Sequence, residues 1–334
     1  MVIKMIANLD NLFFEGVHKY TLADFIAVTK NESFKDKHFN NELLLTHIGK
    51  YEAEKFFQPK TFAYNIVNHS KDIGKTQQEL ISEIESFYSY LNLFVFTLWF
   101  VKDNSINMTD AHTLTLSPNM YYTVTNLSIF TNARGEFNDV YFTNKEINLA
   151  HRIFINLEKV YTPESEIIKQ KSKQNKKGAQ EIPYDPNLKV STYYNNLYKT
   201  ERAINFLISA RKVKYLPQKV SLYMPVFETL FSCGIANEVT QRVSERVAKY
   251  IGKNAADRYA IFKIVKDAYN LRSRYLHGDE ISNRHTSTEY LKELSYKVDE
   301  LARNIFYKII MKDSETFLLS NTDLDEYFNK MMLS

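Results

Sequence analysis

The sequence predicts a mainly α-helical protein, with an N-terminal α+β region followed by an antiparallel helical bundle. Its 334 residues include only 8 Gly and 7 Pro, below the usual shares of roughly 7% and 5%, which disfavours folds built from many tight turns. After residue 190, apolar residues recur at steps of three and four in six successive segments, as they do on one face of a helix. With 23 Tyr and 23 Phe, the expected core is aromatic.

Charge and cysteine content limit the class of protein. The net charge of +4 permits a nucleic-acid partner but does not require one, because solubility alone explains it. The single cysteine, Cys233, excludes an intrachain disulfide and any zinc site built from several cysteines. The 8 histidines are scattered along the chain, so we expect no metal site and no cofactor.

No segment indicates a membrane or secretion. Met1–Asp10 lacks the basic and apolar segments of a secretory signal. The most apolar stretch, Phe87–Val101, has 15 residues, whereas about 20 are needed to span a bilayer. We therefore expect a buried helix there, no membrane partner and a cytoplasmic location.

The chain is expected to have three parts. Residues 1–165 form an α+β region of unknown role, residues 166–190 a Lys-rich linker or loop, and residues 191–334 a helical domain. The linker contains KQKSKQNKK at Lys169–Lys177, which buries too little apolar surface to offset its ordering entropy. A solvated linker is favoured over an arm that contacts nucleic acid.

The N-terminal part mixes strands and helices. Residues 1–70 are expected to hold short strands and one or two helices. Thr76-Gln77-Gln78-Glu79 has the form of a capping box and begins a helix that ends near Val101. Alternating β-branched and aromatic residues predict a hairpin around Ala133–Glu136. The later predicted elements are strands at His112–Leu116, Tyr121–Asn132 and Phe137–Thr143, and a helix at Asn144–Tyr161.

The C-terminal part predicts helices with short connections. Pro217 precedes one helix, and Gly252 and Gly278 are expected to end two others. The predicted helices are Ser191–Val213, Val220–Phe231, Asn237–Ile251, Ala255–His277, Thr286–Met311 and Asp323–Met332.

One segment, Ile73–Thr76, imitates a phosphate-binding loop. A Walker A loop carries a further glycine ahead of its Gly-Lys pair, with four residues between, and His69 stands there instead. The capping role of Thr76 already explains the segment, so nucleotide binding is not expected.

Arg272 stands out from its surroundings. On a helix, Phe262, Val265, Tyr269, Arg272 and Leu276 follow one another at steps of three and four, which puts a guanidinium on an apolar stripe. An arginine buried there costs several kcal/mol unless an anion pairs with it.

Two carboxylates could supply that anion within the chain. Glu228 interrupts the apolar run Phe227–Phe231, and Glu238 lies in the first turn of the following helix, where the macrodipole favours an acid in any case. Either pair would be wholly structural. Arg274 lies one residue off the stripe and is expected at the surface.

His277 is the last helical residue before Gly278. A histidine there interacts favourably with the helix dipole, or it serves as an acid or base near Arg272. Five residues separate the two side chains by about 140° on a straight helix. They converge only if the last turn unwinds or if two subunits contribute.

The segment Leu271–Gly278, LRSRYLHG, resembles the signature of the HEPN superfamily, an Arg, four to six variable residues and a His. The Arg-Ser-basic-x-x-His-Gly form is that of the Apea-like branch. Bare Arg–His spacing arises by chance, but further segments also resemble this branch over about residues 190–312. These are Phe227–Phe231, Asn237–Ala248, Arg258–Phe262 and Asp267–Tyr269.

The resemblance implies an α-helical, metal-independent endoribonuclease that acts on RNA as a homodimer with a composite active site. His277 would be the general acid or base at the 2′-hydroxyl or the leaving oxygen, and Arg272 would stabilise charge on the phosphate. The products would carry 2′,3′-cyclic phosphate or 3′-phosphate ends. Supporting roles would fall to Arg274 as a phosphate contact, Asn270 as a polar group, and Glu228 and Glu238 orienting Arg272.

The same resemblance implies a role in bacterial antiphage defence or growth arrest, with a regulatory or trigger protein as a further partner. The N-terminal region would sense the trigger, restrain the nuclease or position RNA. One alternative is a non-catalytic HEPN-like module that binds nucleic acid or a partner protein. Another is a structural dimerisation protein with no nucleic acid involved.

Overall fold

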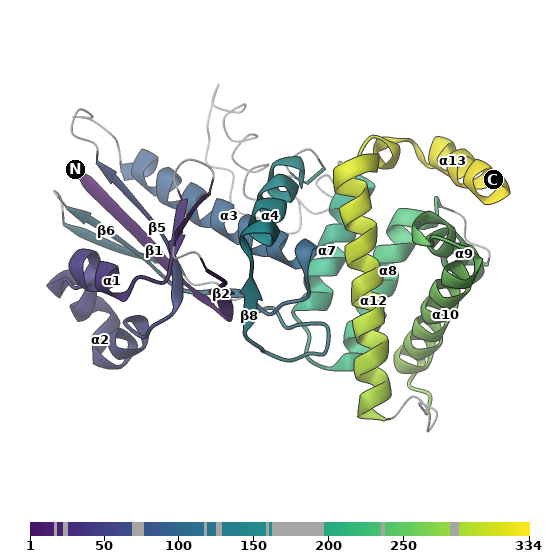
Figure 1. Cartoon of the computed structure of the whole chain (residues 1–334), viewed down its shortest axis with the longest axis horizontal. Helices are drawn as coiled ribbons and strands as arrows, with labels where there is room; N and C mark the ends of the chain where they lie inside the picture. The colour runs from purple at the N-terminus through teal and green to yellow at the C-terminus, as the bar shows by residue number, and fades with distance from the viewer. Residues whose placement is uncertain are drawn as a thin grey trace, which may run out of the picture. The chain divides into compact units, whose positions relative to one another are not determined.

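The structure, a computed structural model, describes residues 1–16, 19–22, 26–68, 77–116, 119–124, 129–157, 160–161, 197–234, 238–280 and 287–334 (Figure 1). The chain divides into two compact units. The sheet unit comprises Met1–Phe130 and Phe137–Arg152, and the helical unit comprises Thr131–Glu136 and Ile153–Ser334. The prediction of a mostly helical protein with an N-terminal sheet region is confirmed. The predicted linker 166–190 and the Ile73–Thr76 segment lie outside the described residues.

The sheet unit is built around β1 (Val2–Asp10), the longest of the strands expected in the first 70 residues. Residues 2–9 are largely apolar and buried, as expected of a strand with a neighbour on each side. All neighbouring strands in this sheet pair antiparallel. Its order is β3 (Lys19–Leu22), β4 (Ile26–Thr29), β5 (Thr61–Asn68), β1, β6 (Asn107–Leu116) and β7 (Met120–Val124).

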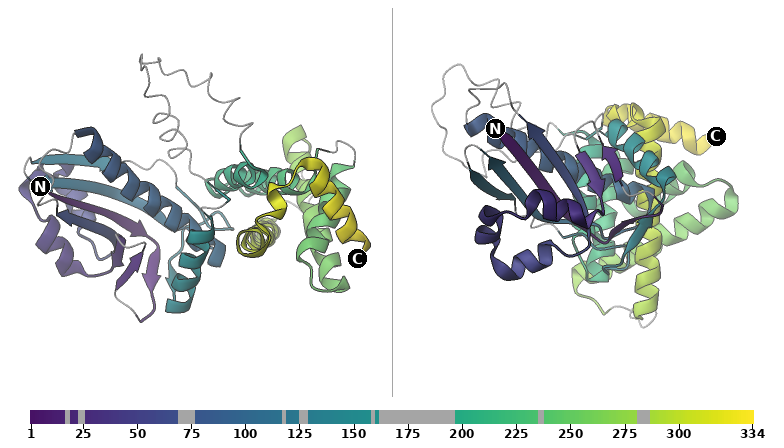
Figure 2. Two further views of the ribbon diagram at one scale, coloured as in Figure 1. Left: turned by 90° about the horizontal axis from the view of Figure 1, so that it is seen from above. Right: turned by 60° about the vertical axis from the view of Figure 1, so that its left-hand side comes forward.

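Helices cover both faces of this sheet (Figure 2). Leu114 of β6 packs with α1 (Glu32–Phe39) and α2 (Glu42–Phe56). Its neighbour Thr113 contacts the Tyr88 hydroxyl of α3 (Gln77–Val101) at 3.1 Å. Successive strand residues point to opposite faces, so α3 lies across the sheet from α1 and α2. Among the described helices, α3 alone is long and apolar enough to cross a membrane, and 67% of its apolar window is buried, as in the core helix of a folded domain.

The predicted hairpin around Ala133–Glu136 is wrong. β7 pairs with β6, whereas β8 (Val140–Phe142) pairs in parallel with β2 (Leu12–Phe14). Thr131–Glu136, here called the inserted turn, belongs to the helical unit. Its shape is local, since the Asn132 side chain accepts hydrogen bonds from the amides of Arg134 and Glu136, both at 2.9 Å.

Side-chain contacts and one close backbone approach fix the inserted turn in the helical unit. The fully buried Lys219 donates to the Thr131 hydroxyl at 2.9 Å. The Ser295 hydroxyl donates to the Ala133 carbonyl at 2.5 Å, and Lys292 pairs with Glu136 at 2.6 Å. Gly135 has φ 74°, and a Cβ there would lie 2.4 Å from the Lys214 carbonyl oxygen, so a side chain would not fit.

The helical unit is organised around α8 (Leu216–Phe231), which packs against α7 (Lys199–Arg211), α9 (Val239–Ile251), α10 (Ala255–His277) and α12 (Thr288–Lys308). Its side chains are buried on most sides, including Val220, Tyr223 and Phe227, as expected of a central helix. Short connections join α7 to α8 and α9 to α10, which favours antiparallel neighbours. The remaining helices are α4 (Asn144–Leu157) and α13 (Asn321–Leu333), with a π-helical turn at Ile309–Asp313 and a 3₁₀ turn at Thr316–Leu318.

Candidate functional site

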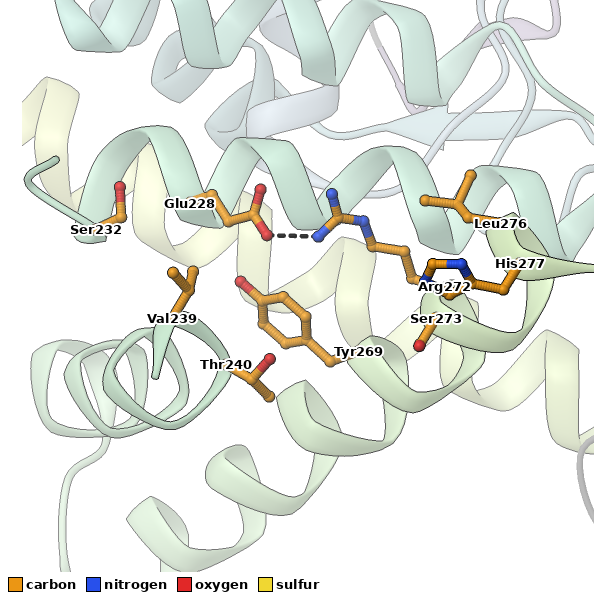
Figure 3. Close-up of a pocket in the computed structure, with 9 residues that line it drawn as sticks. All are labelled: Glu228, Ser232, Val239, Thr240, Tyr269, Arg272, Ser273, Leu276 and His277. Atoms are coloured by element: carbon orange, nitrogen blue, oxygen red, sulfur yellow. Dashed lines mark hydrogen bonds and ion pairs between the residues drawn. The ribbon is translucent and has the colours of Figure 1, made fainter. Parts of the chain in front are cut away.

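A pocket of about 500 Å³ lies among α8, α9 and α10, and it contains both residues predicted to be catalytic (Figure 3). Four of its side chains can donate hydrogen bonds through a hydroxyl, and the remaining polar ones are an arginine, a histidine and a glutamate. Its lining consists of Glu228, Ser232, Val239, Thr240, Tyr269, Arg272, Ser273, Leu276 and His277.

Arg272 forms an ion pair inside this pocket. Its Nη1 donates to Oε1 of Glu228 at 2.5 Å, and the two side chains are 27% and 25% exposed. Of the two partners that the sequence left open, the structure therefore selects Glu228. A guanidinium has five N–H donors, and Arg272 has no second hydrogen-bond partner among the described residues. Its other donors are available to an anion in the pocket.

Arg272 lies at the edge of the buried face of α10. The buried side chains of this helix are Ile261, Val265, Ala268, Tyr269 and Leu271. They include Val265 and Tyr269 of the predicted stripe, but Ala268 and Leu271 lie to one side of it. Leu276, the last residue of the predicted stripe, is 61% exposed. Arg272 therefore bears only part of the desolvation cost expected of a fully buried arginine.

Tyr269 is a site residue that the sequence reasoning treated only as part of the apolar stripe. Its side chain is 6% exposed, and its hydroxyl points toward the Glu228 carboxylate (Figure 3). The hydroxyl makes no well-formed hydrogen bond to a described residue, although it lies close enough to the Glu228 carboxylate to interact with it. Burial raises the pKa of Tyr269, and the negative charge of Glu228 raises it further, so the hydroxyl stays protonated and can donate.

This geometry gives a testable result for Tyr269→Phe. We expect the free energy of unfolding to stay within about 1 kcal/mol of the unaltered protein, or to rise, because the buried hydroxyl that is removed makes no well-formed hydrogen bond. Urea denaturation measures this. A loss above 2 kcal/mol would mean that the hydroxyl is bonded in solution, and Tyr223→Phe serves as the contrast, because that hydroxyl donates to Asp299 at 2.5 Å.

His277 is exposed and ends α10. Gly278, with φ 72°, caps the helix in the left-handed conformation that glycine adopts easily. The helix stays regular through His277, so the last turn does not unwind. Arg272 and His277 nevertheless line one pocket within one chain, because the long arginine side chain reaches across toward α8 (Figure 3).

The other three residues predicted to support the site lie outside this pocket. Arg274 is exposed, and its Nη1 donates to the Glu280 carbonyl at 3.1 Å. Asn270 is exposed on α10, and Glu238 is exposed at the start of α9 with φ 54°. Their predicted roles would require a bound substrate or a second subunit.

Sequence reasoning missed the hydroxyl groups around the ion pair. Ser232, Thr240 and Ser273 line the pocket, and serine and threonine are too frequent for their types to single them out. Together with Tyr269 and Arg272 they surround the pocket with donors contributed by α8, α9 and α10 (Figure 3), and the imidazole of His277 lines the same pocket. Such a set suits a phosphate group, which accepts hydrogen bonds through several oxygens.

Among the described residues, no three His, Cys, Asp or Glu side chains gather in a way that could hold a metal ion. Comparisons of the chain with protein-family models, with curated proteins and with solved structures find no match.

Proposed function

We propose that the protein is a metal-independent endoribonuclease of the HEPN type. The observation that supports this proposal is the shared pocket of Arg272 and His277, with Arg272 oriented by Glu228 at 2.5 Å. Arg272 and His277 are the two fixed residues of the Arg-x₄-His pattern that resembles the HEPN signature. The substrate is RNA, and the working form is a homodimer whose two copies complete one active site.

In the proposed reaction the 2′-hydroxyl of a nucleotide attacks the adjacent phosphorus atom. His277 takes the hydroxyl proton, the bond from phosphorus to the 5′-oxygen breaks, and an imidazole returns a proton to that oxygen. A histidine suits both steps because its ordinary pKa lies near neutrality. The free N–H groups of Arg272 donate to the phosphate oxygens as their charge grows. The products are a 2′,3′-cyclic phosphate and a 5′-hydroxyl end.

The test is cleavage of a labelled RNA by the purified protein in excess EDTA. We expect cleavage to proceed, with 2′,3′-cyclic phosphate or 3′-phosphate ends identified by mass spectrometry. A matched RNA with a single 2′-deoxy nucleotide at the mapped cleavage position should resist cleavage at that position only, because the nucleophile is missing there.

Cleavage that stops in EDTA and returns with added Mg²⁺ would contradict the proposal. Cleavage at the 2′-deoxy position would contradict it equally, since another nucleophile would then be at work. In either case the RNA cleavage would not proceed by metal-independent attack of the 2′-hydroxyl.

A second candidate function is a non-catalytic module that binds nucleic acid or a partner protein. The Arg272–Glu228 pair favours it in one respect, because an ion pair explains a half-buried arginine without any reaction. This candidate predicts RNA affinity that falls with salt and no product in the same assay. The structural dimerisation protein predicts neither affinity nor product.

The setting that we propose is bacterial antiphage defence or growth arrest in the cytoplasm. A ribonuclease free in its host would destroy the host's RNA, so a regulatory or trigger protein belongs to the proposal. The resemblance of Leu271–Gly278 to the Apea-like branch is its support.

A further inference from the structure

A straight row of polar side chains runs along the outer face of α10. Successive members lie four, three, four, four and three residues apart, which keeps them within about 80° of one another on the helix. All are exposed except Lys266, which is half-buried. This basic row consists of Tyr259, Lys263, Lys266, Asn270, Arg274 and His277, and at about 1.5 Å per residue it spans roughly 27 Å.

The cations of the basic row, Lys263, Lys266 and Arg274, form no ion pair with any described residue. One acid of α10, Asp267, lies beside the row at about 40° from Lys263 on the helix, and its carboxylate accepts a hydrogen bond from the Tyr290 hydroxyl of α12 at 3.4 Å. By contrast, the cations of α12 and α13 are paired, for example Lys297 with Glu293 and Lys330 with Glu326. Over residues 239–277 the chain has 9 Lys or Arg against 3 Asp or Glu, whereas the whole chain has a net charge of only +4.

The far end of the row presents an aromatic ring to solvent. Tyr259 is 60% exposed, and the Lys263 ammonium lies 4.3 Å from the centre of its ring. An exposed aromatic ring beside a cation can stack an unpaired base while the cation holds the neighbouring phosphate. A base inside a duplex cannot stack on a side chain in this way.

We propose that the basic row binds one single-stranded RNA segment along α10 and leads its backbone to His277. Tyr259 stacks a base about 27 Å from the site, by the rise of the helix, and Lys263, Lys266 and Arg274 bind the phosphates between. This inference rests on the proposed function for the chemistry at His277, but the binding itself does not need that chemistry. It gives the exposed Arg274 and Asn270 a role outside the pocket.

The test uses a fluorescent single-stranded RNA with 2′-O-methyl groups at every position, which cannot be cleaved through its 2′-hydroxyl. Anisotropy gives the Kd of the full chain at several salt concentrations. In the triple variant Lys263→Ala, Lys266→Ala, Arg274→Ala, we expect the Kd to rise roughly tenfold or more. The slope of the logarithm of the association constant against the logarithm of the salt concentration is negative, and its magnitude should decrease by about 2. Each of the three lost phosphate contacts contributes about 0.7 for a single strand.

Two further variants sharpen the result. Tyr259→Leu should raise the Kd for the single strand by roughly 5- to 100-fold and leave binding of a matched duplex unchanged. Lys330→Ala removes one exposed cation from α13 and should leave both Kd and slope unchanged. Circular dichroism checks that the fold is kept in all variants. The single variant Lys263→Ala removes an exposed side chain, whereas Lys266→Ala also removes a hydrogen bond to Gln241 of α9 at 3.2 Å.

Three outcomes would overturn the proposal. The triple variant could match Lys330→Ala in Kd and salt slope, or duplex RNA could bind as tightly as the single strand. The triple variant could also lose its dimer mass in sedimentation, which would make the row a subunit contact. A fourth result would separate the two proposals. If RNA binds tightly through the row but natural RNA stays intact in the cleavage assay, the binding proposal stands and the proposed function is refuted.

Discussion

Replacing His277 by alanine is expected to slow RNA cleavage by about 10²–10⁴-fold, the usual contribution of a general acid or base. The side chain is exposed at the end of α10 and has no hydrogen-bond partner among the described residues. Its removal therefore lowers the free energy of unfolding by at most the interaction between a cation and the helix dipole at the C-terminus, about 0.3–1 kcal/mol. Single-turnover cleavage measures the rate, and thermal denaturation shows whether the fold is intact.

Two matched variants separate chemistry from other effects. His47→Ala removes another exposed histidine, on α2 in the sheet unit, and should leave the rate unchanged. Arg272→Lys keeps the charge but loses the planar fork that can contact Glu228 and a phosphate together, so it should also slow cleavage. If His277→Ala, prepared in the same way, cleaves at the full rate, the imidazole transfers no proton and the assignment fails.

Replacing Asp299 by alanine is expected to lower the free energy of unfolding by about 3–5 kcal/mol, the cost of breaking a buried ion pair. Asp299 of α12 is 1% exposed. It accepts hydrogen bonds from Arg303 Nη1 at 2.7 Å and from the Tyr223 hydroxyl of α8 at 2.5 Å. Without the carboxylate, a buried guanidinium and a buried hydroxyl lose this acceptor together.

Urea denaturation measures the loss, and the next residue supplies the control. Glu300 is exposed on the same helix, so Glu300→Ala should change the free energy by less than about 0.5 kcal/mol. Asp299→Asn keeps an acceptor and should lose less than Asp299→Ala. Equal stabilities for Asp299→Ala and Glu300→Ala would show that this network does not hold α8 against α12.

The helix that carries the site could be predicted to the residue, because its ends are marked locally. The Asn254 side chain accepts a hydrogen bond from the Asp257 amide at its start, and Gly278 ends it with φ 72°. Both signals act within four residues and need no knowledge of the rest of the fold. The predicted bounds Ala255–His277 agree with the structure, although the sequence analysis used Gly278 and the apolar spacing and did not name Asn254.

Contacts between distant segments were harder to predict. Val140 pairs with Leu12 across more than a hundred residues, and alternation in the sequence does not specify which strand is the neighbour. The choice of Glu228 over Glu238 as the partner of Arg272 depends on how α8 packs on α10. The direction of the Tyr269 hydroxyl depends on the same packing, and no pattern in the sequence encodes it.

Because of the inserted turn, a single cut at the Lys-rich segment does not separate the whole helical unit from the sheet unit. A fragment that begins at residue 191 keeps every helix from α7 onward but loses Thr131–Glu136, and with it one acceptor for the buried ammonium of Lys219. The ammonium keeps the carbonyls of Ala210 and Val213 as acceptors, so the loss is that of one hydrogen bond from a charged donor, about 1.5–3 kcal/mol. The helical unit thus includes six residues that come before residues 137–152 of the sheet unit. A cut at the Lys-rich segment separates these six residues from the helices that they contact, so a fragment meant to keep the whole helical unit must begin before Thr131.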